Sequence, residues 1–443
     1  MGAHQPPSSL IERLKMSDIS ADGLDANGLV LAADGTPLKR SLARAMRRQK
    51  LRALLLVAPL LIFVLLTFIY PIGVMLSRSV QNDIVANTLP ETVRVLGRWD
   101  ASTGELPDEE VYAAFTRDMV IAIADKKHTR LGSRLNYEKT GLSSMFRQSG
   151  RKMKKLDPVA DAPFKDKLIG IHKGWGDIET WKTLQTYSGI YTSGYFLNAV
   201  DAHMTPEGMA WQPEDKQILL KLFGRTLIMS LIITGSCIML GYPIAWLLAN
   251  VSPRNANLLL ILVLLPFWTS LLVRTSAWKV MLQQNGVINE VLVWIGLVPD
   301  AERLILINNQ FGTIVAMTHI LLPFMILPMY SVMSTIPPVY LRAAKSMGAT
   351  NWTAFWRVYF PQSVPGIGAG SILVFILSIG YYITPEIVGG TKGVFISNRI
   401  AYHISSSLNW GLAAALGTIL LVVVLALYWA YDRIVGIDNV KLG

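Results

Sequence analysis

Three ionisable side chains stand out inside long apolar stretches of this sequence, where a charge is costly to bury. They are Arg274, which follows Trp268 and Thr269, together with His319 and Glu386. Ionisable residues in a hydrocarbon environment are rare and are functional candidates by default. Arg274 could line a polar pathway, or it could pair with helix carbonyls near an interface. For His319 the simpler interpretation is packing.

Glu386 offers a carboxylate a few residues after Tyr381 and Tyr382. A carboxylate beside aromatic rings can bind an ammonium group through its charge and through cation–π contacts. Alternatively, the Glu386 side chain reaches outward and keeps its charge in water. The candidate pathway or binding residues are therefore Trp268, Thr269, Arg274, Tyr381, Tyr382 and Glu386.

No arrangement of residues typical of an enzyme is visible. The six histidines are scattered without metal-ligand spacing. No nucleophile elbow or paired acidic motif stands near an apolar stretch. The phosphate-binding pattern G-x-x-x-x-G-K-[ST] is absent, and the Gly-Gly-Thr-Lys at residues 389–392 lacks its spacing. We therefore expect no catalytic residue, no metal site and no cofactor bound by this chain.

The composition indicates that most of the chain lies in an environment other than water. Of its 443 residues, 52% are hydrophobic and only 16% are charged, whereas soluble domains carry about 25% charged residues. The net charge is +11, and a large part of the basic excess lies between Lys39 and Arg52, directly before the first apolar run. That placement is typical of a cytoplasmic membrane flank and argues against nucleic-acid binding. The single cysteine, Cys237, can form no internal disulfide.

Six apolar stretches are long enough to cross a bilayer, which needs about 20 helical residues. Helices satisfy every backbone group in lipid, so we expect an all-α membrane protein with six transmembrane helices. The predicted spans are Arg52–Leu76, Arg225–Asn250, Leu258–Met281, Phe311–Met333, Pro365–Val388 and Leu412–Tyr431.

The charges of the short loops predict the orientation. The basic flank places the N-terminus inside, and Arg254 marks the link between the second and third spans as inside. The loop 335–364 carries basic residues and no acidic ones, whereas the loop 282–310 carries three acidic residues against one basic residue and falls outside. Both termini are therefore predicted to be cytoplasmic.

Four regions follow from these assignments. Residues 1–50 are expected to form a disordered, basic cytoplasmic tail, and residues 51–76 the first transmembrane helix. Residues 77–221 form a hydrophilic extracytoplasmic insertion, predicted to be mostly helical, with one helix over Asp108–Lys127. Residues 222–443 carry five transmembrane helices and the cytoplasmic loop 335–364. The aromatic residues of the insertion are predicted to form a small core: Trp175, Trp181, Tyr187, Tyr191, Tyr195 and Phe196.

The cytoplasmic loop predicts two short helices separated by a break. Pro337 and Pro338 can start the first helix, and Gly348 is placed to end it. Thr350 or Asn351 can cap a second helix, which Pro361 is expected to terminate. A basic helix–glycine–helix with small, exposed alanines suits docking onto a partner protein.

This loop resembles the "EAA" loop of bacterial ATP-binding-cassette importer permeases. The pattern falls on Arg342, Ala343 and Ala344, then on Gly348 and Ala349, with Phe355 and the closing Phe360-Pro361 after them. Arg342 stands where the family has Glu, which removes or reverses any salt bridge made there. Stretches from Phe223, Leu265, Tyr381 and Asn409 also resemble spermidine/putrescine-type permeases. The tail and the insertion lie outside the resemblance.

The resemblance implies the permease subunit of an importer in the inner (cytoplasmic) membrane of a bacterium. It implies a type I importer fold, a second permease subunit, an extracytoplasmic solute-binding protein and two cytoplasmic ATPase subunits that hold ATP and Mg²⁺. The coupling residues it implies are Arg342, Ala343, Ala344, Gly348 and Ala349.

Several alternatives stay open at the level of sequence. A polyamine such as spermidine or putrescine is the first expectation for the solute, and ferric iron, an opine or a similar small solute is the alternative. A membrane receptor is a further alternative, although no cytoplasmic signalling domain is apparent in the sequence. The insertion could dock the binding protein or brace the partner permease.

Overall fold

The computed structural model describes residues 38–158, 160–205 and 208–435. It divides into two units, residues 1–74 and 75–443. Five helices in the described residues are long and apolar enough to cross a membrane, and a sixth candidate is a pair of helices bent by 91°. The protein is therefore mostly helical, as the sequence predicts, with five or six candidate spans.

The first candidate span covers Gln49–Ser77. It is formed by the later part of α2 (Leu38–Val64), a π-helical turn η2 (Leu65–Ile69) and α3 (Tyr70–Ser77). Residues 38–50, expected in the disordered tail, are helical because this stretch is rich in good helix formers and holds no breaker. The rest of the predicted tail, residues 1–37, lies outside the described residues.

The insertion is built from short helices, as predicted from its sequence. The predicted helix at Asp108–Lys127 is α6. The elements are α4 (Asp83–Thr88), α5 (Pro90–Leu96), η3 (Ala101–Thr103), α6 (Glu109–Ala124), α7 (His128–Leu135), α8 (Leu142–Met153), α9 (Lys165–Ile171), η4 (Lys173–Gly176), α10 (Ile178–Thr186), α11 (Gly194–Ala199), the antiparallel hairpin β1 (Ala202–Thr205) and β2 (Gly208–Trp211), and η5 (Glu214–Lys216).

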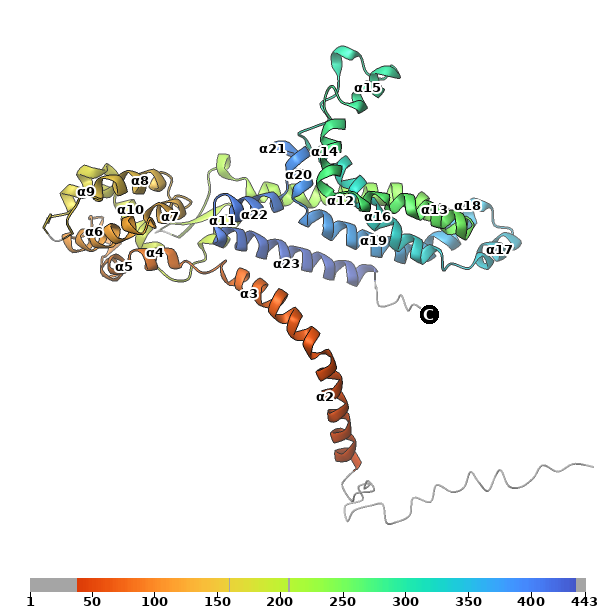
Figure 1. Ribbon diagram of the computed structural model, residues 1–443, viewed down its shortest axis with the longest axis horizontal. Helices are drawn as coiled ribbons and strands as arrows, with labels where there is room; N and C mark the ends of the chain where they lie inside the picture. The colour runs from red at the N-terminus through yellow and green to blue at the C-terminus, as the bar shows by residue number, and fades with distance from the viewer. Residues whose placement is uncertain (1–37, 159, 206–207, 436–443) are drawn as a thin grey trace, which may run out of the picture. The chain divides into compact units, whose positions relative to one another are not determined.

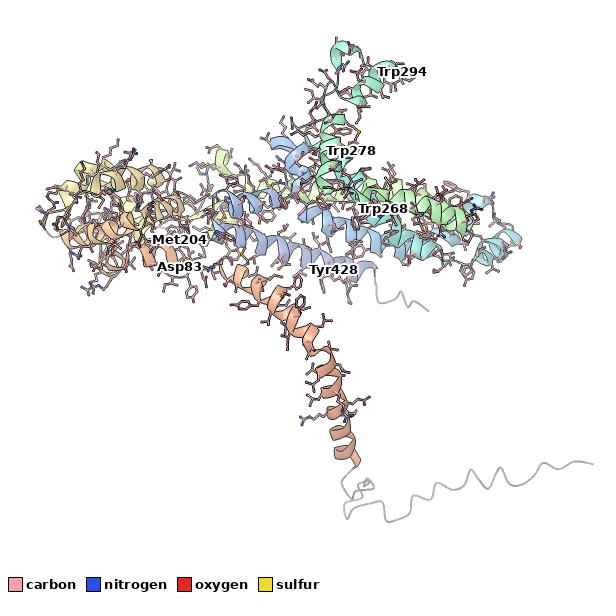
Figure 2. The ribbon with its side chains drawn as sticks, in the orientation of Figure 1. Asp83, Met204, Trp268, Trp278, Trp294 and Tyr428 are labelled. Atoms are coloured by element: carbon pink, nitrogen blue, oxygen red, sulfur yellow. The ribbon has the colours of Figure 1, made fainter. Side chains whose placement is uncertain are left out.

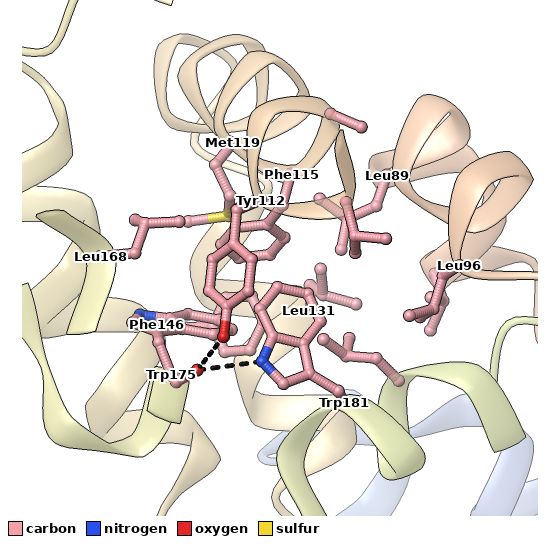
Figure 3. Packing of buried hydrophobic residues seen from close by; sticks show 14 of the residues in the cluster. Leu89, Leu96, Tyr112, Phe115, Met119, Leu131, Phe146, Leu168, Trp175 and Trp181 are labelled. Atoms are coloured by element: carbon pink, nitrogen blue, oxygen red, sulfur yellow. Dashed lines mark hydrogen bonds between the residues drawn. The ribbon is translucent and has the colours of Figure 1, made fainter. Parts of the chain in front are cut away.

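The insertion has its own hydrophobic core, centred on two tryptophans. Trp175 and Trp181 are fully buried against aromatic residues of α6 and α8, and Figure 3 shows this packing. The carbonyl of Trp175 accepts hydrogen bonds from the Tyr112 hydroxyl (2.7 Å) and from the Trp181 indole (3.0 Å). The predicted aromatic core is thus confirmed for Trp175, Trp181 and Tyr187, but it is wrong for Tyr191, which is exposed.

A single antiparallel β-bridge, between Gln81 and Tyr191, forms a narrow neck at the base of this core. The amide of Asn82 donates to the carbonyl of Ile190 (2.7 Å), and the amide of Thr192 donates to the carbonyl of Val80 (2.8 Å). The segment that leads into the insertion's core is thereby hydrogen-bonded to the segment that leads out of it. The helix after the neck, α11, packs in a separate cluster, whereas Met204 on β1 still packs against the insertion's core.

The remaining helices form the membrane part of the second unit. They are α12 (Leu219–Asn250), α13 (Pro253–Leu264), η6 (Leu265–Trp268), α14 (Leu271–Met281), α15 (Val287–Trp294), η7 (Asp300–Glu302), α16 (Gln310–Met333), α17 (Pro338–Ser346), α18 (Asn351–Ala354), η8 (Phe355–Tyr359), α19 (Phe360–Gly380), α20 (Ile383–Val388), α21 (Gly390–Gly393), α22 (Ile396–Ser405) and α23 (Trp410–Val435).

Helices α12, α16 and α19 lie side by side and form the centre of this part (Figure 1). Their shared core is rich in methionine and small residues, and Gly366 and Gly370 of α19 lie against the backbone of α16. A side chain at either glycine would push the two helices apart. Small residues at such contacts let helices in lipid approach closely.

The predicted third span is not one continuous helix. It is broken between η6 and α14. Pro266 has no amide hydrogen, and Thr269 and Ser270 adopt extended conformations that end the series of helical hydrogen bonds. The amide and the hydroxyl of Thr269 both donate to the carbonyl of Pro266, at 3.3 and 2.8 Å, which satisfies the broken end.

The predicted fifth span, Pro365–Val388, is shifted toward the N-terminus. Its continuous helix runs over Asn351–Gly380, and residues 383–388 form the separate helix α20. Tyr381 is extended after Gly380, which ends α19. The second, fourth and sixth predicted spans agree with α12, α16 and α23 to within a few residues.

Candidate functional site

The cytoplasmic loop folds as the predicted helix, break and second helix, with one difference. Pro338 lies in the first turn of α17, and Gly348 follows the helix with a left-handed φ of +89°. Such a φ is strained for any residue with a Cβ atom, so glycine suits this turn. The Thr350 hydroxyl then accepts a hydrogen bond from the amide of Thr353 (3.2 Å) and caps α18, as predicted.

Pro361 does not terminate the second helix, contrary to the prediction. The chain widens into the π-helical turn η8 and continues through Pro361 into α19. A proline clashes with the carbonyl four residues earlier in an α-helix, and a π turn relieves this clash by shifting the hydrogen bonds to i→i+5. The same arrangement precedes Pro71, where η2 ends two residues earlier. The loop is thereby fused to a membrane helix.

The predicted coupling residues lie on α17 and just after it. Arg342 and Ala343 are exposed, and Arg342 forms no ion pair with any described residue. Ala344 is only 5% exposed, so the expectation that both alanines face a partner is wrong for it. It faces the second helix of the loop. An open groove of about 420 Å³ lies here, lined by Tyr340, Ala343, Ala344, Met347, Val358 and Gln362.

Aromatic contacts fix the loop to the membrane core. The ring of Tyr242 on α12 lies 6.1 Å from that of Phe355 and 5.9 Å from that of Phe360. The hydroxyl of Tyr242 is also 3.0 Å from that of Ser363. A force applied to this loop is therefore transmitted to α12 and α19 through packed side chains rather than through a flexible link.

Part of the predicted set of intramembrane residues converges where α14, α16 and α20 meet. The buried hydroxyls of Thr275 and Thr384 are 3.1 Å apart and hold α14 against α20. Arg274 interacts electrostatically with Tyr381 and with His319. The Nε atom of Arg274 is buried without a hydrogen-bond partner among the described residues.

His319 is hydrogen-bonded to a neighbouring helix, which is consistent with the packing role expected of it. Its Nδ1 atom accepts a hydrogen bond from the Trp278 indole at 3.1 Å. Figure 2 marks Trp278 on α14 and Trp268 at the bend that precedes this helix. Trp268 and Thr269 are both exposed there, and no described contact joins either of them to Arg274.

Glu386 lies on α20 with its carboxylate held in place. The side-chain amide of Asn398 donates to Oε2 of Glu386 at 2.6 Å and to the carbonyl of Tyr382 at 2.8 Å. Glu386 is exposed, and so is the ring of Tyr382, at 47%. Nothing in the sequence singled out Asn398, because its contact with Glu386 joins α20 to α22.

Comparison with known proteins gives the context of these sites. Residues 220–435 match the family of binding-protein-dependent transport system inner membrane components. The spermidine/putrescine transport system permease protein PotB of Salmonella typhimurium is 35% identical over 47% of this chain and 73% of its own length. The inner membrane ABC transporter permease protein YdcU of Escherichia coli is 32% identical over 59% of this chain and 86% of its own length. A solved bacterial ABC transporter involved in alginate import aligns with a TM-score of 0.40 and 23% identity, over 52% of this chain and 81% of that one.

The chain belongs to the inner-membrane permeases of binding-protein-dependent ABC importers. Such a permease is a multi-pass membrane component that does no catalysis itself, and it works with ATPase subunits and a binding protein. The resemblance found in the loop is therefore confirmed at the level of the family. The matched region begins at the start of α12, so the insertion and the first span lie outside it.

Proposed function

We propose that this permease, together with a second and different permease subunit, forms the pathway for a small cationic solute of the polyamine type. An extracytoplasmic binding protein would deliver the solute. Two ATPase subunits would each receive a coupling helix, which in this chain is α17 with Gly348 and Ala349. The similarity to spermidine/putrescine permeases supports the choice of solute.

The proposal includes a type I importer fold with six spans and both termini in the cytoplasm. The bent pair α13 and α14 would count as one span, and the break at Pro266 would lie beside the pathway. The basic flank before the first span and the basic loop 335–364 support this orientation. The insertion would then lie outside the cytoplasm.

One observation carries the choice of a cation: the carboxylate of the exposed residue Glu386 is held in place by Asn398, which also bonds the carbonyl of Tyr382, a residue with an exposed ring. A fixed carboxylate binds an ammonium group without losing side-chain freedom, and the ring adds cation–π attraction.

Arg274 favours a second candidate, a solute that also carries a carboxylate, such as an opine. Its guanidinium would repel a polyamine, and its unpartnered Nε atom could donate to a carboxylate oxygen. A polyamine would need Glu386, whereas a solute with a carboxylate would need Arg274.

Uptake by paired variants tests the proposal. Glu386→Gln keeps an oxygen that accepts from Asn398 and removes the charge, so we expect uptake of radiolabelled spermidine to fall roughly tenfold. Arg274→Gln should leave that uptake unchanged or raise it. The matched control is Glu302→Gln, an exposed carboxylate in the loop 282–310. Equal spermidine uptake by Glu386→Gln and wild type would reject the cation site, and loss of opine uptake in Arg274→Gln would favour the second candidate.

A further inference from the structure

A pocket of about 420 Å³ lies where the insertion meets the start of the last membrane helix. Its walls come from the segment after α3, from α4, α7 and α8, from α11 and from the loop that precedes α23. Figure 2 marks Asp83 on α4 at this place. The charged residues of the lining are four arginines and one carboxylate: Arg78, Arg130, Arg134, Arg147 and Asp83.

The contact that forms the pocket is tight. Gly411, in the first turn of α23, lies against the ring of Tyr195, and a Cβ atom added at this glycine would overlap the ring. The Tyr195 hydroxyl in turn accepts a hydrogen bond from Nε of Arg134 at 2.8 Å. The insertion and the membrane helix are thus locked together at the wall of the pocket.

Two buried donors in this wall have no acceptor. Arg134 is 6% exposed, and its Nη1 atom is paired with Glu138, but its Nη2 atom has no partner in the described part of the chain. Asn409 is 8% exposed, and its Oδ1 atom accepts from the amide of Leu412 while its Nδ2 atom has no partner. A buried donor without an acceptor costs about 1–3 kcal/mol.

The surroundings of these donors are positive. Arg78, Arg130 and Arg147 form no ion pair with any described residue. The N-terminus of α23, a helix of 26 residues, also faces the pocket. The amide of Leu412 is capped by Asn409, but the amides before it lack intrahelical partners, and the dipole of the helix adds positive potential. Donors of this kind from several directions suit a ligand with several acceptor oxygens and negative charge.

We propose that this pocket binds a phosphate group. Phosphate offers several strongly accepting oxygens, and guanidinium groups match its geometry. The position favours a lipid headgroup as its source, because α23 is a candidate span that begins at Trp410, an exposed residue of the type enriched at membrane interfaces. Free inorganic phosphate is the other source of the same chemistry. The proposal does not depend on which solute is transported.

The sharpest test is Asn409→Asp. Aspartate caps helices as well as asparagine does, so α23 keeps its cap, while the unpartnered donor becomes a negatively charged acceptor. The full-length chain, purified with the subunits that accompany it, is titrated with short-chain phosphatidylglycerol and, separately, with inorganic phosphate. We expect the wild type to bind the lipid and Asn409→Asp to bind it at least roughly tenfold more weakly. The thermal midpoint of the unliganded variant should stay unchanged.

A second pair of variants tests one of the three exposed arginines, Arg78, Arg130 and Arg147, which can be replaced without emptying a core. Arg147→Gln should weaken binding, whereas Arg151→Gln, one turn away on α8 and outside the pocket lining, should not. Binding of inorganic phosphate but not of the lipid would support a phosphate site and reject a lipid headgroup as the source of the phosphate. Binding of neither probe, or equal binding by the wild type and Asn409→Asp, would overturn the proposal.

Discussion

His403 is a buried histidine that the structure holds in its neutral form. It lies on α22, 6% exposed, with its Nδ1 atom 2.8 Å from the hydroxyl of Ser407. Burial, together with a smaller effect of the charge of Arg399, lowers its pKa to about 4. Protonation of this side chain therefore opposes folding.

Acid should destabilise the protein through His403. The unfolded chain protonates this histidine near pH 6.5 and the folded chain only near pH 4, so the unfolded state binds more protons between these values. The contribution of the neutral imidazole to the free energy of unfolding is complete above pH 6.5. It falls as the pH drops toward 4, by at most about 3 kcal/mol. Thermal midpoints across this range should show His403→Gln to be less acid-sensitive than wild type, and parallel curves would contradict this account.

At Gly411, the absence of a side chain lets the start of α23 pack closely against Tyr195 of the insertion. Gly411→Ala would press on Tyr195 and disturb its hydrogen bond with Arg134, which should cost about 1–3 kcal/mol. Gly417→Ala, in the same helix with open space around it, is the matched control and should be neutral or stabilising. Thermal melting in detergent compares the two variants. A Gly411→Ala protein as stable as the control would show that the contact is loose.

At the scale of elements, the turn after α17 should control coupling. Gly348 needs a φ of +89°, and its amide donates to the carbonyl of Lys345 at 3.0 Å. Proline can supply neither, whereas asparagine tolerates the left-handed conformation and meets no neighbour there.

We therefore expect Gly348→Pro to reach the membrane but to lose solute-stimulated ATPase activity in the assembled complex. Gly348→Asn should keep most of that activity. The readout is phosphate release with and without the solute-loaded binding protein. Normal stimulation in Gly348→Pro would remove α17 from the coupling path.

The sequence predicted the elements whose cause is local. The spans at α12, α16 and α23 follow from continuous apolar runs, and the break at Gly348 follows from its residue type. Prolines were harder, because Pro243 and Pro323 stay inside helices while Pro266 ends one. Extended residues follow Pro266, so the helix ends there. A π turn precedes each of Pro71 and Pro361, so the helix continues through them.

The sites were less predictable than the spans, since they depend on contacts between distant segments. Arg274 and Glu386 stood out because charges are rare in apolar runs. Asn398, which holds Glu386, and Asn409, which faces the arginine-lined pocket, are ordinary polar residues until the chain folds. The single pattern of the sequence that pointed to a partner was the loop 335–364.

At the scale of the whole molecule, the insertion combines a separate core with a firm attachment. Its aromatic core closes at the neck, while α11 packs with α12, α22 and α23 in a second cluster. The carboxylate of Asp201, after α11, accepts hydrogen bonds from the amides of Leu219 (3.0 Å) and Leu220 (2.8 Å) at the start of α12. Docking of the binding protein and bracing of the partner permease both stay predictions for this part.

The most direct test of the central claim is the ATPase activity of the whole transporter. The chain is co-expressed with the products of its neighbouring genes, and the purified complex is reconstituted and assayed with a panel of binding proteins and solutes. We predict that ATPase subunits co-purify and that one binding protein, loaded with a polyamine-like solute, stimulates hydrolysis. A chain that purifies without any ATPase subunit, or a complex that no loaded binding protein stimulates, would contradict the account.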